Sequence, residues 1–119
     1  MSKRSTEFDT VLELCRHPHR RTVLAVLAQQ KRAITIQDIT KTIAKHTHEA
    51  PLTEASGETL TRIQHSLHHV HLPKIEAAGV IDYDGQRHQI EPTQQLSQLQ
   101  PFLTAIIKSD PTLDPPVEL

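Results

Sequence analysis

The chain has 119 residues, enough for one domain with its own hydrophobic core but for little more. Its 13 Lys and Arg nearly balance its 14 Asp and Glu, so the overall charge identifies neither a nucleic acid nor a membrane as the partner. A single cysteine excludes an internal disulfide and a multi-cysteine zinc site, and the longest apolar run (residues 23–28) is far below the roughly 20 residues of a membrane span. The chain opens without a basic-then-apolar leader, so we expect a cytoplasmic protein with no membrane association.

We expect the first five residues to be disordered and a first helix to begin at Thr6, which can cap it. The apolar residues that follow recur at helical spacing: Phe8, Val11, Leu12 and Cys15. Because Cys15 belongs to this stripe, we interpret it as a small core residue rather than a reactive thiol.

A second helix is predicted over about residues 18–29, because Pro18 suits the first helical position and disfavours helix in the residue before it. Its first turn holds Arg20 and Arg21, at the end where the helix dipole disfavours cations. The pair indicates either an external anion or two solvated side chains, and both arginines are candidate phosphate contacts.

A third helix is predicted from about residue 36. Thr35 and Asp38 resemble a capping box with Asp in place of Glu, and Ile34 and Ile39 are spaced as a hydrophobic staple. Two cations lie on the outer side of this helix: Lys41 and Lys45.

After a loop over residues 46–57, a fourth helix is predicted over about residues 58–78, interrupted at Pro73 and ended by Gly79. Its core side carries Leu60, Ile63, Leu67 and Val70. Its opposite side presents Thr61, Arg62, His65 and His69. Arg62 is the best reader of bases there, because its planar guanidinium matches the acceptors of guanine.

A β-hairpin is predicted over residues 80–90, with Asp84 and Gly85 as a two-residue turn. In that register Asp82 faces Arg87 across the strands. The inward side would be shared by Ile81, Tyr83 and Ile90.

A last helix is predicted within residues 92–109, and the proline-rich segment 110–119 is expected to be disordered. One seam of this helix carries Leu96, Leu99, Leu103 and Ile106, with Phe102 and Ile107 beside it. The stripe is wider than one small core needs, so we expect a homodimer that pairs through this helix. The alternative is that the stripe folds back onto its own domain.

A family resemblance rests on two stretches of the chain. Residues 69–83 read HVHLPKIEAAGVIDY, which resembles the end of the recognition helix and the first wing strand of ArsR-type winged-helix regulators. Residues 18–27 (PHRRTVLAVL) resemble another helix of that superfamily, and the HVHLP form is similar to small winged-helix domains of halophilic archaea. The resemblance covers about residues 6–91. It implies an α+β, mainly α, winged helix-turn-helix with a two-stranded hairpin as the wing, followed by the C-terminal helix.

The resemblance also implies a DNA-binding transcriptional regulator that lays its recognition helix, about residues 58–78, in the major groove of double-stranded DNA. The candidate contacts are Arg20, Arg21, Lys41, Lys45, Thr61, Arg62, His65 and His69. The two aspartates of the wing make it a poor phosphate contact. Because Arg62 is the one cation of the recognition helix before Pro73, a winged helix that binds a protein instead of DNA stays open as the alternative.

Histidines raise one more alternative, a histidine-based metal-sensing regulator. They follow the pattern H-x-x-H-H-x-H: His65, His68, His69 and His71. His65 and His69 are one helical turn apart, a spacing that can chelate Zn²⁺ or Ni²⁺. The sensor cysteines of the resembled superfamily are missing, so we expect no metal and no cofactor. The sequence also offers no phosphate-binding glycine loop and no catalytic triad on a shared face, so we expect that the protein is not an enzyme.

Overall fold

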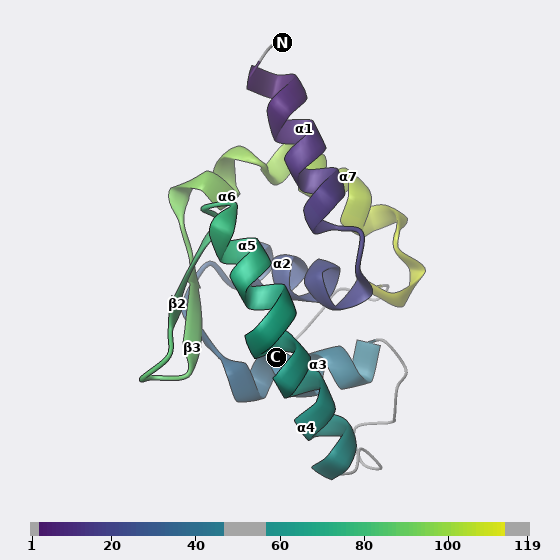
Figure 1. Cartoon of the computed structure of the whole chain (residues 1–119). Helices are drawn as coiled ribbons and strands as arrows, with labels where there is room; N and C mark the ends of the chain where they lie inside the picture. Colours follow the sequence, from purple (N-terminus) through teal and green to yellow (C-terminus); the bar gives the residue numbers. More distant parts are fainter. Residues whose placement is uncertain (1–2, 47–56, 114–119) are drawn as a thin grey trace.

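The computed structural model describes residues 3–46 and 57–113, which form a mainly helical α+β arrangement around a small antiparallel sheet (Figure 1). This confirms the α+β, mainly α, part of the predicted fold. The elements in chain order are α1 (Lys3–Leu14), α2 (Pro18–Gln30), β1 (Ile34–Thr35), α3 (Ile36–His46), α4 (Gly57–Ser66), the π-helical turn η1 (Leu67–His71), α5 (Leu72–Ala77), β2 (Ile81–Asp84), β3 (Gln89–Pro92), α6 (Gln94–Gln98), α7 (Gln100–Ser109) and the 3₁₀ turn η2 (Pro111–Leu113).

The first helix begins three residues before the predicted cap at Thr6, so the expected disorder of residues 1–5 is wrong from Lys3 onward. The start of α2 agrees with the prediction, with Pro18 in the first turn. His17 caps this helix, because its ring nitrogen Nδ1 accepts a hydrogen bond of 3.1 Å from the backbone N–H of His19. Lys31 ends the helix in the left-handed conformation, with φ of 55°.

The predicted start of α3 is also confirmed. Thr35 Oγ1 accepts a hydrogen bond from the N–H of Asp38 at 3.1 Å, and Ile34 and Ile39 are both buried. A further bond comes from the hairpin, because the Ile36 N–H donates to the His88 carbonyl at 2.8 Å. The hairpin therefore caps α3 as well as extending the sheet. The predicted loop lies outside the described residues, except that α3 extends to His46 and α4 begins at Gly57.

The predicted interruption at Pro73 takes an unexpected form. Helices α4 and α5 run on as one rod, joined by η1, in which the Leu72 N–H bonds to the Leu67 carbonyl five residues earlier (Figure 1). The wider turn accommodates a proline that has no N–H and would clash with an α-helical carbonyl. It also shifts the apolar face by one position: Val70, predicted to be in the core, is 54% exposed, whereas His71 is 3% exposed.

The hairpin differs from the prediction in its turn and its register. Four residues, 85–88, connect β2 and β3, and Asp82 pairs with Glu91 instead of Arg87. Arg87 stays near the turn, with its Nε 3.8 Å from Asp84 Oδ2. The sheet gains a third strand, because β1 pairs with β3 and gives the order β1-β3-β2.

The C-terminal segment folds back onto its own domain. Leu99 separates α6 from α7 two residues before Pro101, and α7 packs against α1 and α2. Leu96, Leu99 and Leu103 are buried within the chain, so they do not form the exposed seam that was predicted. Residues 111–113 form η2 with Leu113 buried, which corrects the expected disorder for this part of the tail. None of the described helices is long and apolar enough to cross a membrane.

Candidate functional site

Six of the predicted contact residues lie on the outer surface of two packed helices. All of their side chains are exposed: Lys41 and Lys45 on α3, and Thr61, Arg62, His65 and His69 on the α4–η1 rod. The rings of His65 and His69 are neighbours along the rod, with centroids 4.3 Å apart and planes inclined by 42°. The rod therefore presents hydroxyl, guanidinium and imidazole groups to solvent, on the side away from its buried residues Ile63 and Leu67.

Arg20 has a different position, which corrects its assignment as a phosphate contact. Its side chain is buried at the start of α2. It donates hydrogen bonds from Nε to the Leu14 carbonyl at 2.8 Å and from Nη2 to the Glu13 carbonyl at 3.2 Å. A third bond runs from Nη1 to His71 Nδ1 at 3.3 Å. The guanidinium thus holds the end of α1 and the rod together, and it does not face an external anion.

Arg21 is half-buried and also bonds to groups of the same chain. Its Nε forms an ion pair with Asp110 Oδ2 at 2.7 Å, and its Nη1 donates to the Cys15 carbonyl at 2.7 Å. Burial alone would raise the pKa of the Asp110 carboxyl, but hydrogen bonds from Arg21 and Thr112 outweigh burial and hold this pKa below its usual range. The anion that the two arginines indicated in the sequence is, for Arg21, a carboxylate of the same chain.

A groove of about 480 Å³ lies between α3, α4 and the hairpin turn. Its lining residues are Thr35, Gln37, Thr40, Lys41, Leu60, Gln64, Arg87 and His88. Lys41 and the 76% exposed side chain of Arg87 bring two positive charges to the same groove. Sequence reasoning missed Arg87 because it assumed a two-residue turn that paired this arginine with Asp82.

The hairpin is fixed to the rod by a contact that the sequence did not indicate. The hydroxyl of Tyr83 on β2 and Nδ1 of His68 on η1 form a hydrogen bond of 2.6 Å. The pKa of His68 is lowered, first by burial and then by the neighbouring charges of His88, His69 and His65. A neutral His68 at pH 7 keeps this bond, so the turn and the rod hold the groove between them.

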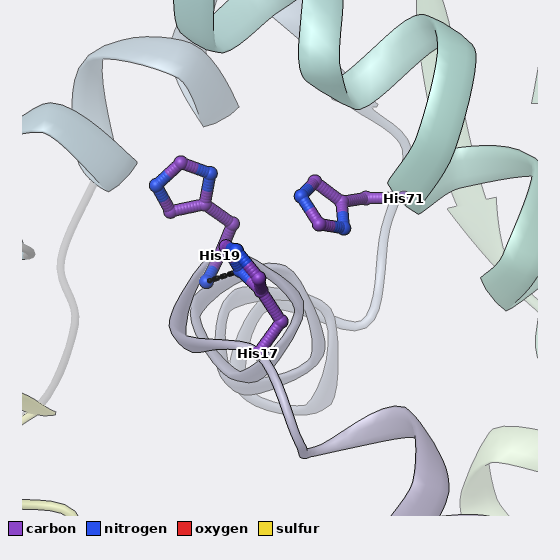
Figure 2. A group of neighbouring side chains, drawn as sticks. All are labelled: His17, His19 and His71. Atoms are coloured by element: carbon purple, nitrogen blue, oxygen red, sulfur yellow. Dashed lines mark hydrogen bonds between the residues drawn. The ribbon is translucent and has the colours of Figure 1, made fainter.

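Two histidines at the start of α2 meet a third from the distant rod beside Arg20, and we name this group the histidine cluster: His17, His19 and His71. One ring nitrogen of each lies within 4.8 Å of those of the others. Figure 2 shows His17 and His19 at the start of α2, with His71 projecting toward them from the opposite helix. Burial lowers the pKa of His71 to about 4, and the charges of His17, His19 and Arg20 act in the same direction. The sequence placed His71 near the core but gave no signal that His17 and His19 would meet it.

A protein-family model described as a domain of unknown function (DUF7344) matches residues 12–91 of the chain. The chain belongs to this family. No curated protein and no solved structure matches the chain.

The part of the chain that matches DUF7344 contains both features described above. It includes every lining residue of the groove and all three residues of the histidine cluster. It ends within β3, so Asp110, the partner of Arg21, lies beyond the matched DUF7344 region.

Proposed function

We propose that this DUF7344 chain is a cytoplasmic winged helix-turn-helix regulator of transcription, similar to ArsR-type proteins, that binds double-stranded DNA. In this proposal α3 and the α4–η1–α5 rod are the helix-turn-helix, and the β2–β3 hairpin is the wing. The observation that carries it is the exposed polar face of the rod, flanked by a groove to which α3 and the hairpin turn each bring a cation. A helix of this kind fits the major groove, with phosphates on either side.

The phosphate contacts in this proposal are those cations that are exposed. Lys41 and Lys45 lie on α3, and Arg87 lies on the hairpin turn. Arg20 and Arg21 leave this set because their guanidinium groups bond within the protein. Each exposed cation adds affinity without sequence preference, and this part of the binding weakens as salt rises.

The base contacts in this proposal come from the solvent face of the rod. Arg62 is the residue best suited to guanine, because its donors match the O6 and N7 acceptors. Thr61 and His65 flank it on the same exposed side and can bond to either acceptors or donors of the bases. The rings of His65 and His69 act as hydrogen-bond partners of the DNA in this role, without a metal.

The homodimer stays a prediction, but the surface through which it would pair differs from the predicted seam of the C-terminal helix. Because Leu96, Leu99 and Leu103 are buried in the domain, pairing would use what α1 and α7 leave exposed. Phe8 and Leu12 are 44% and 45% exposed, and the rings of Phe8 and the half-buried Phe102 pack in a T-shaped arrangement with centroids 5.5 Å apart. We propose that a second copy covers this apolar surface, which would place two rods on one duplex.

A mobility-shift assay with genomic fragments at low and moderate salt tests the proposed DNA binding. We expect shifted complexes at low salt that weaken as the salt concentration rises, because phosphate contacts release counterions. No complex at low salt would overturn DNA binding.

One observation favours an alternative, in which the winged helix binds a protein. Val70 is 54% exposed on the rod. An apolar side chain cannot bond to a phosphate group, but it can pack against the apolar surface of a protein partner. If the assay detects no DNA complex, Val70→Ser tests this alternative by its effect on the capture of a protein partner.

A further inference from the structure

We propose that the histidine cluster binds one Zn²⁺ ion, held by ring nitrogens of His17, His19 and His71. This site is separate from the DNA-binding face, and the proposal does not depend on DNA binding. It also differs from the exposed pair His65 and His69, which offers two ligands on one helix.

The geometry of the cluster suits a small ion. Three ligand atoms that each lie about 2.0–2.1 Å from Zn²⁺ in a tetrahedral site are about 3.4 Å from one another. The candidate nitrogens lie within 4.8 Å of one another, so modest rotations of the rings bring them to that spacing. His17 is half-buried at the start of α2, and its ring has the most room to rotate.

The chemistry of the cluster selects the class of ion. The group consists of three imidazoles with no carboxylate, whereas Ca²⁺ and Mg²⁺ prefer oxygen ligands. Neutral imidazole is a good ligand for Zn²⁺ and for its spectroscopic substitute Co²⁺. His71 and His19 are buried, so their imidazole nitrogens would replace water molecules of the hydrated ion when it binds.

Two existing hydrogen bonds compete with the ion. A neutral imidazole has one nitrogen with a free electron pair. In the metal-free protein, that pair of His17 accepts the His19 N–H at 3.1 Å, and that of His71 accepts Arg20 Nη1–H at 3.3 Å. The ion must displace both bonds, which are weak in net terms compared with metal–imidazole bonds. Binding would therefore exchange the helix cap and the arginine contact for a metal link between α2 and the rod.

Binding is measured by calorimetric titration of ZnCl₂ into the metal-free full chain, purified without a histidine tag, and by the visible absorption of Co²⁺. We expect one ion per chain, a tetrahedral Co²⁺ spectrum and a higher melting temperature with Zn²⁺, because a ligand that binds the folded state stabilises it. No heat of binding together with an unchanged melting temperature would overturn the proposal.

Matched variants locate the ion. His17→Asn keeps a side-chain oxygen that can accept the His19 N–H, so α2 stays capped while a ligand is lost. Combined with His19→Gln, it should weaken Zn²⁺ binding by more than about 100-fold, since the loss of even an outer-shell partner costs roughly 10–100-fold. The control is His65→Gln with His69→Gln, which should bind Zn²⁺ like the parent chain.

The opposite pattern would contradict the proposal: binding that survives in the His17 and His19 variant and disappears in the His65 and His69 variant. The metal-free melting temperature of each variant shows whether it is folded. If the double variant does not fold, His17→Asn alone should still weaken binding at least about 10-fold. Unchanged binding in that folded single variant would also overturn the assignment.

Discussion

Arg20 on α2 donates a hydrogen bond from Nη1 to Nδ1 of His71, which lies 51 positions later on the rod. Both side chains are buried, and the same guanidinium bonds to two carbonyl groups at the end of α1. One charged group therefore fixes the junction of three helices, and it makes the orientation of the rod depend on α1 and α2.

Arg20→Ala is expected to lower the free energy of unfolding by roughly 2–4 kcal/mol, because it leaves buried carbonyls and an imidazole without their donor. Chemical denaturation measures the change. Arg16→Ala is the control, since the Arg16 side chain is 74% exposed and its loss should cost little. If Arg20→Ala keeps the parent stability and loses DNA binding, Arg20 is a phosphate contact after all.

Stability should fall as the pH drops from about 6.5 toward 4. The pKa of His71 is about 4 in the folded metal-free protein, below the ordinary value, so the unfolded chain takes up its proton first. The stability from this group is fully present above the ordinary pKa and is lost as the pH falls through the folded pKa, by on the order of 3 kcal/mol.

Denaturation of metal-free protein at several pH values between 7 and 4 measures this loss. His65→Gln with His69→Gln removes two exposed rings that do not contact His71, and most of the loss between pH 6.5 and 4 should stay in place. A flat profile would mean that His71 is not kept neutral by burial.

Lys41→Ala and Arg87→Ala should weaken binding to all DNA sequences alike and reduce the salt dependence by about one counterion each. Both side chains line the groove beside the rod. Lys108→Ala, an equal change of charge on the exposed side of α7, is the control. If Lys108→Ala lowers the affinity for DNA as much as Lys41→Ala does, the net charge of the protein and not this groove accounts for the effect.

Arg62→Ala should lower the discrimination between DNA sites by roughly 1–3 kcal/mol, because Arg62 is the proposed base reader. Competition between a selected site and random DNA measures this difference. If Arg62→Ala weakens both equally, the rod contacts phosphates and does not read bases.

Sedimentation of the full chain at tens of micromolar tests the proposed dimer. Leu12→Glu should yield monomers, since Leu12 is 45% exposed on the proposed surface. Val70→Glu changes an exposed apolar residue elsewhere and should leave the dimer intact. A full chain that is already monomeric would remove the dimer from the proposal.

The sequence alone determined the elements whose causes are local. Thr35 and Asp38 mark the start of α3, and Pro18 marks that of α2, because a cap or a first-turn proline acts within a few residues. The apolar spacing of α4 correctly identified Ile63 and Leu67 as core residues for the same reason. The α+β class and the exposed face of Lys41 and Arg62 follow from these patterns.

The tertiary structure decided where the remaining residues lie, because their partners are far away in the chain. Helical periodicity could not anticipate the π-helical turn before Pro73, which exposes Val70 and buries His71. The sequence predicted that Arg21 contacts phosphate, but its guanidinium forms an ion pair with Asp110, 89 positions away in the chain. Only folding brings His17 and His19 to His71, since the meeting of α2 with the rod depends on packing and on Arg20 rather than on any local pattern.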